Sequence, residues 1–168
     1  MDNLIQMRNY FNSGITKPFS FRKEQLIKLK AAVKKYEDQL HQALYADLKK
    51  SPEECWVTET GFLLSEVSHT LKNLKSWMQP ESVSTNLLNL PSKSFVMQEP
   101  LGIILIISPW NYPFQLLMTP LAGAMAAGNC VILKSSEFAP ATSAVMKQLI
   151  EETFDKNYIQ VVGEMAQR

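Results

Sequence analysis

Two short apolar runs, separated by a stretch rich in Leu, Met and Ala, dominate the hydrophobic pattern of this sequence. Residues 101–107 are apolar at every position apart from Gly102, and residues 131–133 repeat this pattern more briefly. Consecutive apolar positions are typical of strands that are buried on both faces of a sheet. Between them, residues 114–127 read as a helix that ends at Gly128. The pattern predicts a β-α-β unit whose two parallel strands are joined by a right-handed crossover.

A second helix and a third strand follow this unit. Pro140 opens the predicted helix, and residues 158–162 read as the strand. The predicted order β-α-β-α-β is the first half of a doubly wound parallel sheet. Parallel strands need neighbours and helical cover on both faces, and the chain ends at Arg168, shortly after the third strand. We therefore expect an incomplete α/β fold.

The N-terminal half shows the spacing of amphipathic helices. Residues 3–12 predict a short helix that Gly14 ends. Ser20 is a suitable N-cap for one long helix over residues 21–49, in which apolar residues recur at spacings of three and four. Such a stripe is typical of a helix that packs against a core.

A second long helix is predicted to start at the segment SPEE. Ser51 fits the N-cap, Pro52 the first helical position and Glu54 the last position of a capping box. The helix is expected to end near Met78, ahead of Pro80. Its expected inner stripe consists of Trp56, Leu63, Val67, Leu71, Leu74 and Met78. We expect this helix and the preceding one to form an antiparallel pair.

Two short stretches on either side of Pro91 predict a β arm. Residues 85–90 and 93–99 are each expected to form a strand, which gives a hairpin. The apolar surface of this arm consists of Leu87, Leu88, Phe95 and Met97. A two-stranded arm cannot bury such a surface by itself. It is therefore expected to pack on the body of the protein or on a second subunit.

The two predicted strands of the β-α-β unit each end in a polar loop, at residues 108–113 and 134–137. In open parallel sheets, ligands bind in the crevice beyond the carboxyl ends of the strands. The order of the elements therefore places four candidate residues on one rim: Trp110, Asn111, Lys134 and Glu137. Two ordinary βα loops, one of them stiffened by prolines, would produce the same pattern. The alternative to a binding site therefore stays open at this point.

Composition narrows the classes of protein to which this chain can belong. It has 168 residues, of which 46% are hydrophobic and 20% charged, and these values are usual for one globular domain. A net charge of +1 without a basic stripe argues against nucleic-acid binding. No apolar run approaches the roughly 20 residues that span a bilayer, and the N-terminus lacks a secretory signal. Cys55 and Cys130 lie far apart without metal-ligand spacing, so we expect a reduced, cytoplasmic protein.

The sequence resembles the aldehyde dehydrogenase family in three segments, PWNYPF at residues 109–114, AGN at 127–129 and LKSSE at 133–137. The resemblance is strongest to the branch that includes fatty and aromatic aldehyde dehydrogenases, and it covers nearly all of the sequence. It implies an incomplete NAD(P)-binding domain over residues 1–168. Its parts would be a helical segment at 1–83, a β arm of the oligomerisation region at 84–100, and the first half of the dinucleotide-binding sheet at 101–168.

This resemblance implies roles for the rim residues. Asn111 matches the family's oxyanion donor, and an uncharged amide offers N–H groups to an alkoxide without a change of protonation. Lys134 matches the contact to the adenosine ribose of the cofactor, and Glu137 its companion. The other residues implied to line the cofactor groove are Ile107, Ser108, Pro109, Trp110 and Ser136. A carboxylate at position 137 would repel a 2′-phosphate, but the branch tolerates both cofactors, so NAD or NADP is expected.

The implied activity is that of an NAD(P)-dependent aldehyde dehydrogenase, which oxidises aliphatic or aromatic aldehydes to carboxylic acids through a thioester. Neither Cys55 nor Cys130 matches the family's nucleophile, which lies in a segment beyond residue 168. We therefore expect this chain to be the N-terminal portion of such an enzyme, to be inactive alone, and to form a homodimer through the arm. The alternatives are a non-catalytic module that binds nucleotide or a partner subunit, and a helix-rich structural protein without a ligand site.

Overall fold

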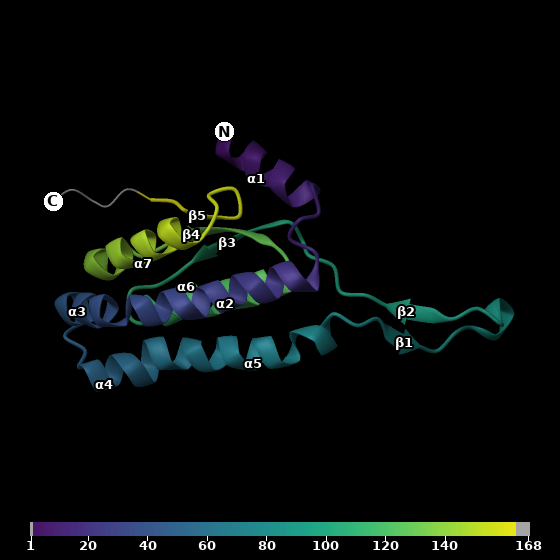
Figure 1. Cartoon of the computed structure of the whole chain (residues 1–168), viewed down its shortest axis with the longest axis horizontal. Helices are drawn as coiled ribbons and strands as arrows, with labels where there is room; N and C mark the ends of the chain where they lie inside the picture. The colour runs from purple at the N-terminus through teal and green to yellow at the C-terminus, as the bar shows by residue number, and fades with distance from the viewer. Residues whose placement is uncertain (1, 164–168) are drawn as a thin grey trace.

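A small parallel sheet, the helices beside it and a projecting β arm make up the molecule (Figure 1). The structure is a computed structural model that describes residues 2–163. Its elements in chain order are α1 (Asp2–Asn12), α2 (Phe19–Lys35), α3 (Glu37–Leu48), α4 (Pro52–Cys55), the π-helical turn η1 (Trp56–Thr60), α5 (Gly61–Trp77), β1 (Glu81–Val83), the 3₁₀ turn η2 (Leu87–Asn89), β2 (Ser94–Val96), β3 (Ile103–Ile107), α6 (Gln115–Ala127), β4 (Cys130–Lys134), α7 (Pro140–Thr153) and β5 (Ile159–Val161).

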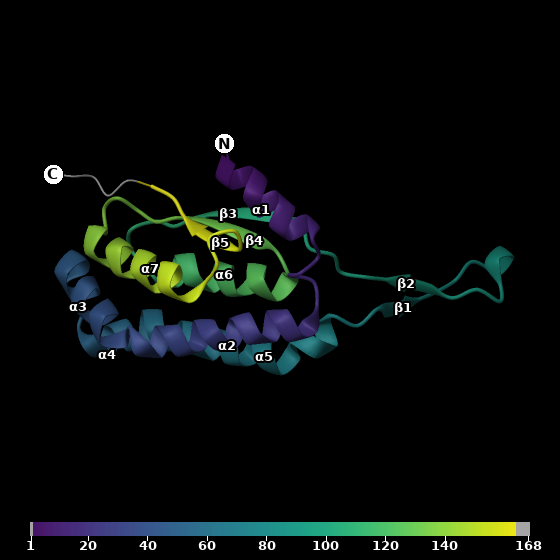
Figure 2. The ribbon, with the colours of Figure 1, turned by 45° about the horizontal axis from the view of Figure 1, so that its top comes forward.

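Strands β3, β4 and β5 form the parallel sheet in that order. Ile103 pairs with Cys130 at the start of β3, and Ile107 pairs with Lys134 at its end. Helices α6 and α7 lie between the sheet and the layer formed by α2 and α5 (Figure 2). The core between these layers contains fully buried side chains such as Leu29, Leu63, Met118, Leu121 and Leu133. The expected α/β class and the β-α-β-α-β order are confirmed.

Strand β3 departs from the expectation that it is buried on both faces. Ile106 is buried, whereas Leu105 and Ile107 are each more than half exposed. Successive side chains of a strand point to opposite faces, so the two exposed residues share the face away from α6. On that face α1 contacts β3, and Phe11 lies beside Gly102 at the start of the strand (Figure 2). The expectation is wrong for the second half of β3, because within residues 2–163 the helical cover of this face stops at α1.

The single long helix expected over residues 21–49 is wrong, because the chain turns at Tyr36. There the backbone adopts φ −98° and ψ 4°, which separates α2 from α3. The Tyr36 side chain is buried, and the change of direction lets α3 pack against α7. Ser20 is not the N-cap either, because α2 already begins at Phe19.

The second predicted helix is confirmed as the continuous helical segment α4–η1–α5, which runs antiparallel to α2 (Figure 1). The hydroxyl of Ser51 caps it by accepting a hydrogen bond from the N–H of Glu54 at 3.2 Å. Trp56 was expected in the inner stripe but is more than half exposed, because the π-helical turn η1 changes the register of the helix faces. A Cβ atom on Gly61 would lie 2.5 Å from the carbonyl oxygen of Trp56, so this turn requires glycine.

The β arm is present, but its first strand lies earlier in the sequence than expected. Strand β1 pairs antiparallel with β2, with Glu81 opposite Val96. The expected strand at 85–90 is wrong, because this segment holds the turn η2, where the side chain of Asn86 accepts a hydrogen bond from the N–H of Leu88 at 3.1 Å. A local bond of this kind favours a turn over a strand ladder.

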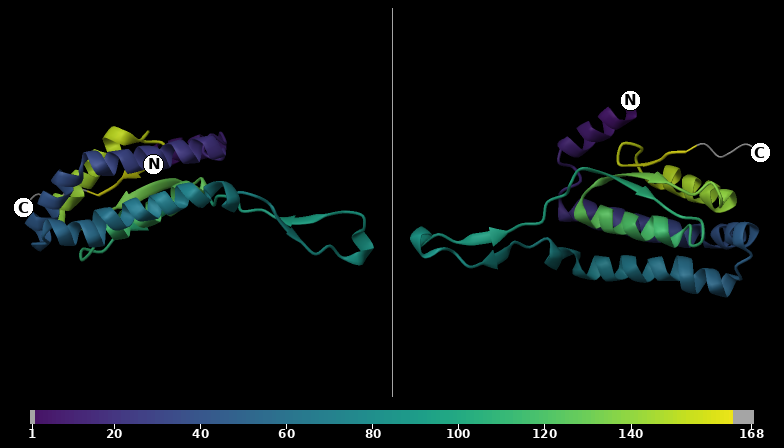
Figure 3. Two further views of the ribbon diagram at one scale, coloured as in Figure 1. Left: turned by 60° about the horizontal axis from the view of Figure 1, so that its bottom comes forward. Right: turned by 180° about the vertical axis from the view of Figure 1, so that it is seen from behind.

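The arm projects from the end of the body opposite to the α3–α4 turn (Figure 3). The expected strand at 93–99 is confirmed over the three residues of β2. Leu87 and Leu88 at the tip are 82% and 91% exposed, so the tip does not pack on the body of this chain. Packing of the arm on a second subunit stays a prediction.

Candidate functional site

The carboxyl ends of β3 and β4 meet at one rim of the sheet. Ile107 pairs with Lys134, and the N–H of Ser108 donates a hydrogen bond to the carbonyl oxygen of Lys134 at 3.1 Å. The loop from β3 to α6 and the loop from β4 to α7 therefore start side by side. The expectation that the loops of Asn111 and Lys134 share a rim is confirmed, while the roles of these residues stay predictions.

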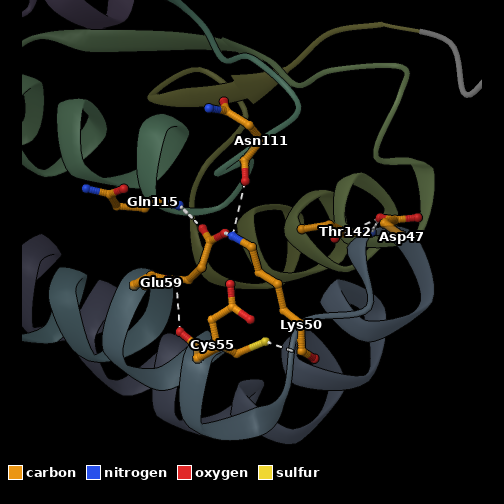
Figure 4. A network of polar contacts seen from close by, with 9 residues as sticks. Asp47, Lys50, Cys55, Glu59, Asn111, Gln115 and Thr142 are labelled. Atoms are coloured by element: carbon orange, nitrogen blue, oxygen red, sulfur yellow. Dashed lines mark hydrogen bonds and ion pairs between the residues drawn. The ribbon is translucent and has the colours of Figure 1, made fainter.

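The loop between β3 and α6 exposes its middle and buries its ends. Asn111 and Trp110 are exposed, whereas Ser108 and Phe114 are buried. The backbone carbonyl of Asn111 points toward Lys50, and its side-chain amide points away from Lys50 (Figure 4). The amide is therefore presented at the surface of the rim by a loop that is anchored on both sides.

The loop between β4 and α7 carries an ion pair. The ammonium of Lys134 lies 3.5 Å from a carboxylate oxygen of Glu137, and both side chains are about half exposed. Hydrogen bonding from its own backbone and then the nearby charge of Lys134 lower the pKa of Glu137 below its ordinary value. Glu137 is therefore an ionised acceptor at neutral pH, next to a cationic donor.

The other expected groove residues divide into exposed and buried ones. Ile107 and Pro109 are exposed. Ser136 is buried, and its hydroxyl accepts a hydrogen bond from the N–H of Phe138 at 3.3 Å, so its side chain closes the loop on itself. Ser108 is also buried, and its hydroxyl has no hydrogen-bond partner within residues 2–163. A buried hydroxyl without a partner is costly, and the burial of this hydroxyl keeps it away from the exposed surface of the rim.

Sequence reasoning missed a buried ion pair behind the first loop. Lys50, just before α4, contacts Glu59 in η1, and their side chains are 8% and 0% exposed. The ammonium of Lys50 also donates to the carbonyl oxygen of Asn111 at 3.1 Å, and Glu59 accepts a hydrogen bond from the N–H of Gln115 at 2.8 Å (Figure 4). A signal was present in the sequence, because Glu59 falls four positions before Leu63, in line with the predicted inner stripe.

A second missed residue, Asp47, holds the helix that follows the other loop. One carboxylate oxygen of Asp47 accepts from the N–H of Ala141 at 3.1 Å, and the other accepts from the N–H and the hydroxyl of Thr142, both at 2.8 Å (Figure 4). These N–H groups belong to the first turn of α7, which has no partners for them inside the helix. Asp47 therefore ties the end of α3 to the start of α7.

Neither cysteine is placed or tuned to act as a nucleophile. Burial raises the pKa of Cys55 to about 11 and that of Cys130 to about 12. Cys130 lies at the start of β4, at the opposite end of the strand from Lys134. Reactive thiols have a lowered pKa and some exposure, so the structure supports the expectation that neither residue is the nucleophile.

No group of three or more His, Cys, Asp or Glu residues within residues 2–163 is arranged to hold a metal ion. Among the helices that the structure describes, none has the length and apolarity needed to cross a bilayer.

Comparison with known proteins gives consistent matches over nearly the full sequence. The model of the aldehyde dehydrogenase family matches residues 6–167. The 4,4′-diaponeurosporen-aldehyde dehydrogenase of Staphylococcus aureus is 48% identical and aligns with 95% of this chain but 36% of its own length. Aldehyde dehydrogenase family 3 member B3 of Mus musculus is 44% identical over 96% of this chain and 34% of its own length. The chain thus spans about a third of the length of these curated relatives.

Solved structures agree with the fold. The substrate-bound state of Staphylococcus aureus AldH superposes with a TM-score of 0.94 at 47% identity, over 96% of this chain and 35% of that one. Structures with the same fold at lower identity include a Streptococcus pyogenes succinic semialdehyde dehydrogenase in complex with NADP⁺ and a Staphylococcus aureus betaine aldehyde dehydrogenase in complex with NAD⁺. Structures of this family are therefore solved with either nicotinamide cofactor.

Proposed function

The chain belongs to the aldehyde dehydrogenase family, and we propose that it forms the part of such an enzyme that holds the adenosine end of NAD or NADP and supplies an oxyanion donor. The substrates would be aliphatic or aromatic aldehydes, oxidised to carboxylic acids through a thioester. The observation that carries this proposal is the hydrogen bond between Ser108 and Lys134, because it sets the two loops side by side. An amide donor and a paired cation and carboxylate then share one rim.

The second loop has the chemistry that a ribose requires. Lys134 is a three-donor point charge suited to hydroxyl oxygens. Glu137, whose pKa is lowered, remains a carboxylate at neutral pH and accepts from hydroxyl groups. The exposed side chains Ile107, Pro109 and Trp110 offer apolar surface beside them. This donor set supports binding of an adenosine moiety across the rim.

The first loop has the chemistry that an alkoxide requires. A bound nicotinamide would accept the hydride, and Asn111 would donate a side-chain N–H to the oxyanion that forms when a thiolate attacks the aldehyde. An amide donor needs no change of protonation, and removal of one such donor typically lowers turnover by about 10²–10³. Pro109 and Pro113 limit the backbone freedom of the loop around this amide.

The thiols of this chain argue against activity of the chain alone. Oxidation through a thioester needs a thiolate near the oxyanion donor. Cys55 and Cys130 are both buried, with pKa values raised to about 11 and about 12. We therefore expect no NAD(P)-dependent aldehyde oxidation by this chain, and turnover at a normal rate would refute that expectation.

Nucleotide binding is the direct test of the proposal. The ¹⁵N-labelled chain would be titrated with millimolar NAD, NADP or AMP and followed by two-dimensional NMR, which detects weak complexes. We expect saturable shifts at Trp110 and in the loop after Lys134, and a loss of affinity of at least tenfold in Lys134→Ala. The matched control is Lys147→Ala, which removes a half-exposed lysine from α7. Absence of saturable shifts with all three nucleotides, or equal binding by Lys134→Ala, would contradict the proposal.

The exposed arm favours a second candidate function, that of a non-catalytic subunit-interaction module. Leu87 and Leu88 at the tip are almost fully exposed, and no contact with the body of this chain covers them. This function differs from the first because it predicts self-association without any response to nucleotide. The NMR titration and a measurement of mass in solution therefore separate the two.

A further inference from the structure

We propose that Lys50 and Glu59 are positioning residues, which fix the loop of Asn111 and the start of α6 against the helical layer. This inference rests on the proposed function, because the position of the loop matters for catalysis only if Asn111 is the oxyanion donor. The anchoring itself is a separate physical claim, which can be measured without nucleotide or aldehyde.

The contacts of the pair reach both ends of a five-residue segment that begins at Asn111 and ends at Gln115. The Lys50 ammonium contacts Glu59, donates to the carbonyl oxygen of Asn111 at 3.1 Å, and lies 4.0 Å from the centroid of the Tyr112 ring. The second carboxylate oxygen of Glu59 accepts from the N–H of Gln115 at 2.8 Å. Each charge therefore contacts its partner and also the segment from Asn111 to Gln115, Lys50 at its start and Glu59 at its end (Figure 4).

Stability alone is a weak explanation for such a pair. Burying two charges costs free energy that their attraction barely offsets, and well-packed apolar replacements are often as stable. An apolar pair, however, could not accept from the Gln115 N–H or donate to the Asn111 carbonyl. What the pair adds over apolar side chains is therefore a set of directional bonds, which end on the loop and on the first residue of α6.

The helix around Glu59 departs from regular geometry at the same place. Glu59 lies in the π-helical turn η1, and Gly61 closes that turn by donating its N–H to the carbonyl oxygen of Trp56. Single π-helical turns are frequent at functional sites. Here the irregular turn is the segment that brings a fully buried carboxylate to the start of α6.

The decisive experiment replaces both charges together. The Lys50→Met/Glu59→Leu chain removes the directional bonds and leaves no unpaired buried charge. We expect its urea midpoint to stay close to that of the parent chain, while the Gln115 amide exchanges with solvent at least tenfold faster. We also expect the NMR order parameters of residues 110–112 to fall toward the flexible range, below about 0.6. Amides in the middle of α7 should keep their protection.

The matched control is Lys147→Met/Glu151→Leu, which replaces an exposed pair on α7 and should leave Gln115 and the loop unchanged. The conservative variant Glu59→Gln keeps an acceptor for the Gln115 N–H, so Gln115 exchange should rise in Glu59→Ala and much less in Glu59→Gln. The comparison of Glu59→Gln with Glu59→Ala is made near neutral pH on folded chains. It does not need the double variant, so it tests the proposal even where the double variant is unstable. A rigid loop in the double variant, an equal loss of protection at all core amides, or equal effects of Gln and Ala would overturn the proposal.

Discussion

Glu137 carries the charge that would decide which nicotinamide cofactor the proposed groove prefers. Its pKa is lowered, so it is ionised at neutral pH, and an ionised carboxylate would repel a 2′-phosphate. We expect Glu137→Gln to raise the affinity for NADP relative to NAD by about tenfold, which corresponds to about 1.4 kcal/mol, in NMR titrations of the folded chain. Glu151→Gln on α7 is the control and should leave the ratio unchanged. An unchanged ratio in Glu137→Gln would place this carboxylate outside the groove.

Both thiols should be unreactive in the folded chain. Burial raises their pKa values to about 11 for Cys55 and about 12 for Cys130, against about 8.5 for a free thiol. We expect iodoacetamide to label neither cysteine of the folded chain at pH 8 and both after unfolding in urea, as read by mass spectrometry. Rapid labelling of Cys55 in the folded chain would instead reveal a thiolate and reopen its role as a nucleophile.

The raised pKa values of the two thiols also determine whether the stability of the chain rises or falls with pH. In the folded chain the thiols hold their protons to higher pH than in the unfolded chain, so the unfolded chain binds fewer protons above about pH 8.5. The stability that these thiols contribute is fully present below that value and is lost as the pH rises to about 11 for Cys55 and about 12 for Cys130. Urea midpoints measured from pH 8 to pH 11 should fall, and replacement of Cys130 by Ala should make the fall shallower.

The rim residues could be placed from the sequence, whereas the residues that hold them could not. Asn111 and Lys134 follow parallel strands, and chain order alone brings such positions to one edge. The local pattern does not single out Lys50 or Asp47, because a charged residue beside an apolar stripe is usually solvated. Their partners, the Asn111 carbonyl and the first turn of α7, come from distant segments, and local periodicity carries no information about those contacts.

The π-helical turn η1 depends on a single glycine. A Cβ atom on Gly61 would lie 2.5 Å from the Trp56 carbonyl oxygen and 2.9 Å from its ring. Gly61→Ala should therefore lower the free energy of unfolding by about 1–3 kcal/mol, the usual cost of overpacking. Gly123→Ala in α6 is a matched control, because nothing lies within 4 Å of its added Cβ. It should raise the free energy of unfolding by about 0.5–1 kcal/mol, and equal effects at both sites in urea melts would contradict the requirement for glycine.

The elements themselves show where periodicity stops being informative. The apolar residues keep a spacing of three and four through Tyr36, although the chain turns there. They do so because α2 and α3 run in different directions but both contribute buried residues to the same core. In the arm, the apolar residues Leu87 and Leu88 suggested a strand, but Asn86 caps a turn at the tip. The turn at Tyr36 results from tertiary packing, because it lets α3 pack against α7. The turn in the arm is stabilised locally, by the hydrogen bond from the N–H of Leu88 to the side chain of Asn86.

The arm and the sheet each leave an apolar surface exposed. The tip of the arm exposes Leu87 and Leu88, and the sheet exposes Leu105 and Ile107 on the face away from α6. Large contiguous apolar patches on a protein surface are typical of association sites. Ile107 is the last residue of β3 and lies at the rim itself, so association at the sheet face would lie closer to the proposed groove than association at the arm.

These surfaces lead to a prediction about self-association. We propose that two copies of the chain associate through their arms, because the leucines at the tip are 82% and 91% exposed and lie away from the body of the chain. Leu87→Ser/Leu88→Ser should reduce the weight-average mass in sedimentation equilibrium to that of one chain. Ile27→Ser, which changes an exposed apolar residue on α2, should leave the mass of the parent chain unchanged. A fall in mass caused by Leu105→Ser/Ile107→Ser and not by the arm variant would assign the contact to the open face of the sheet instead.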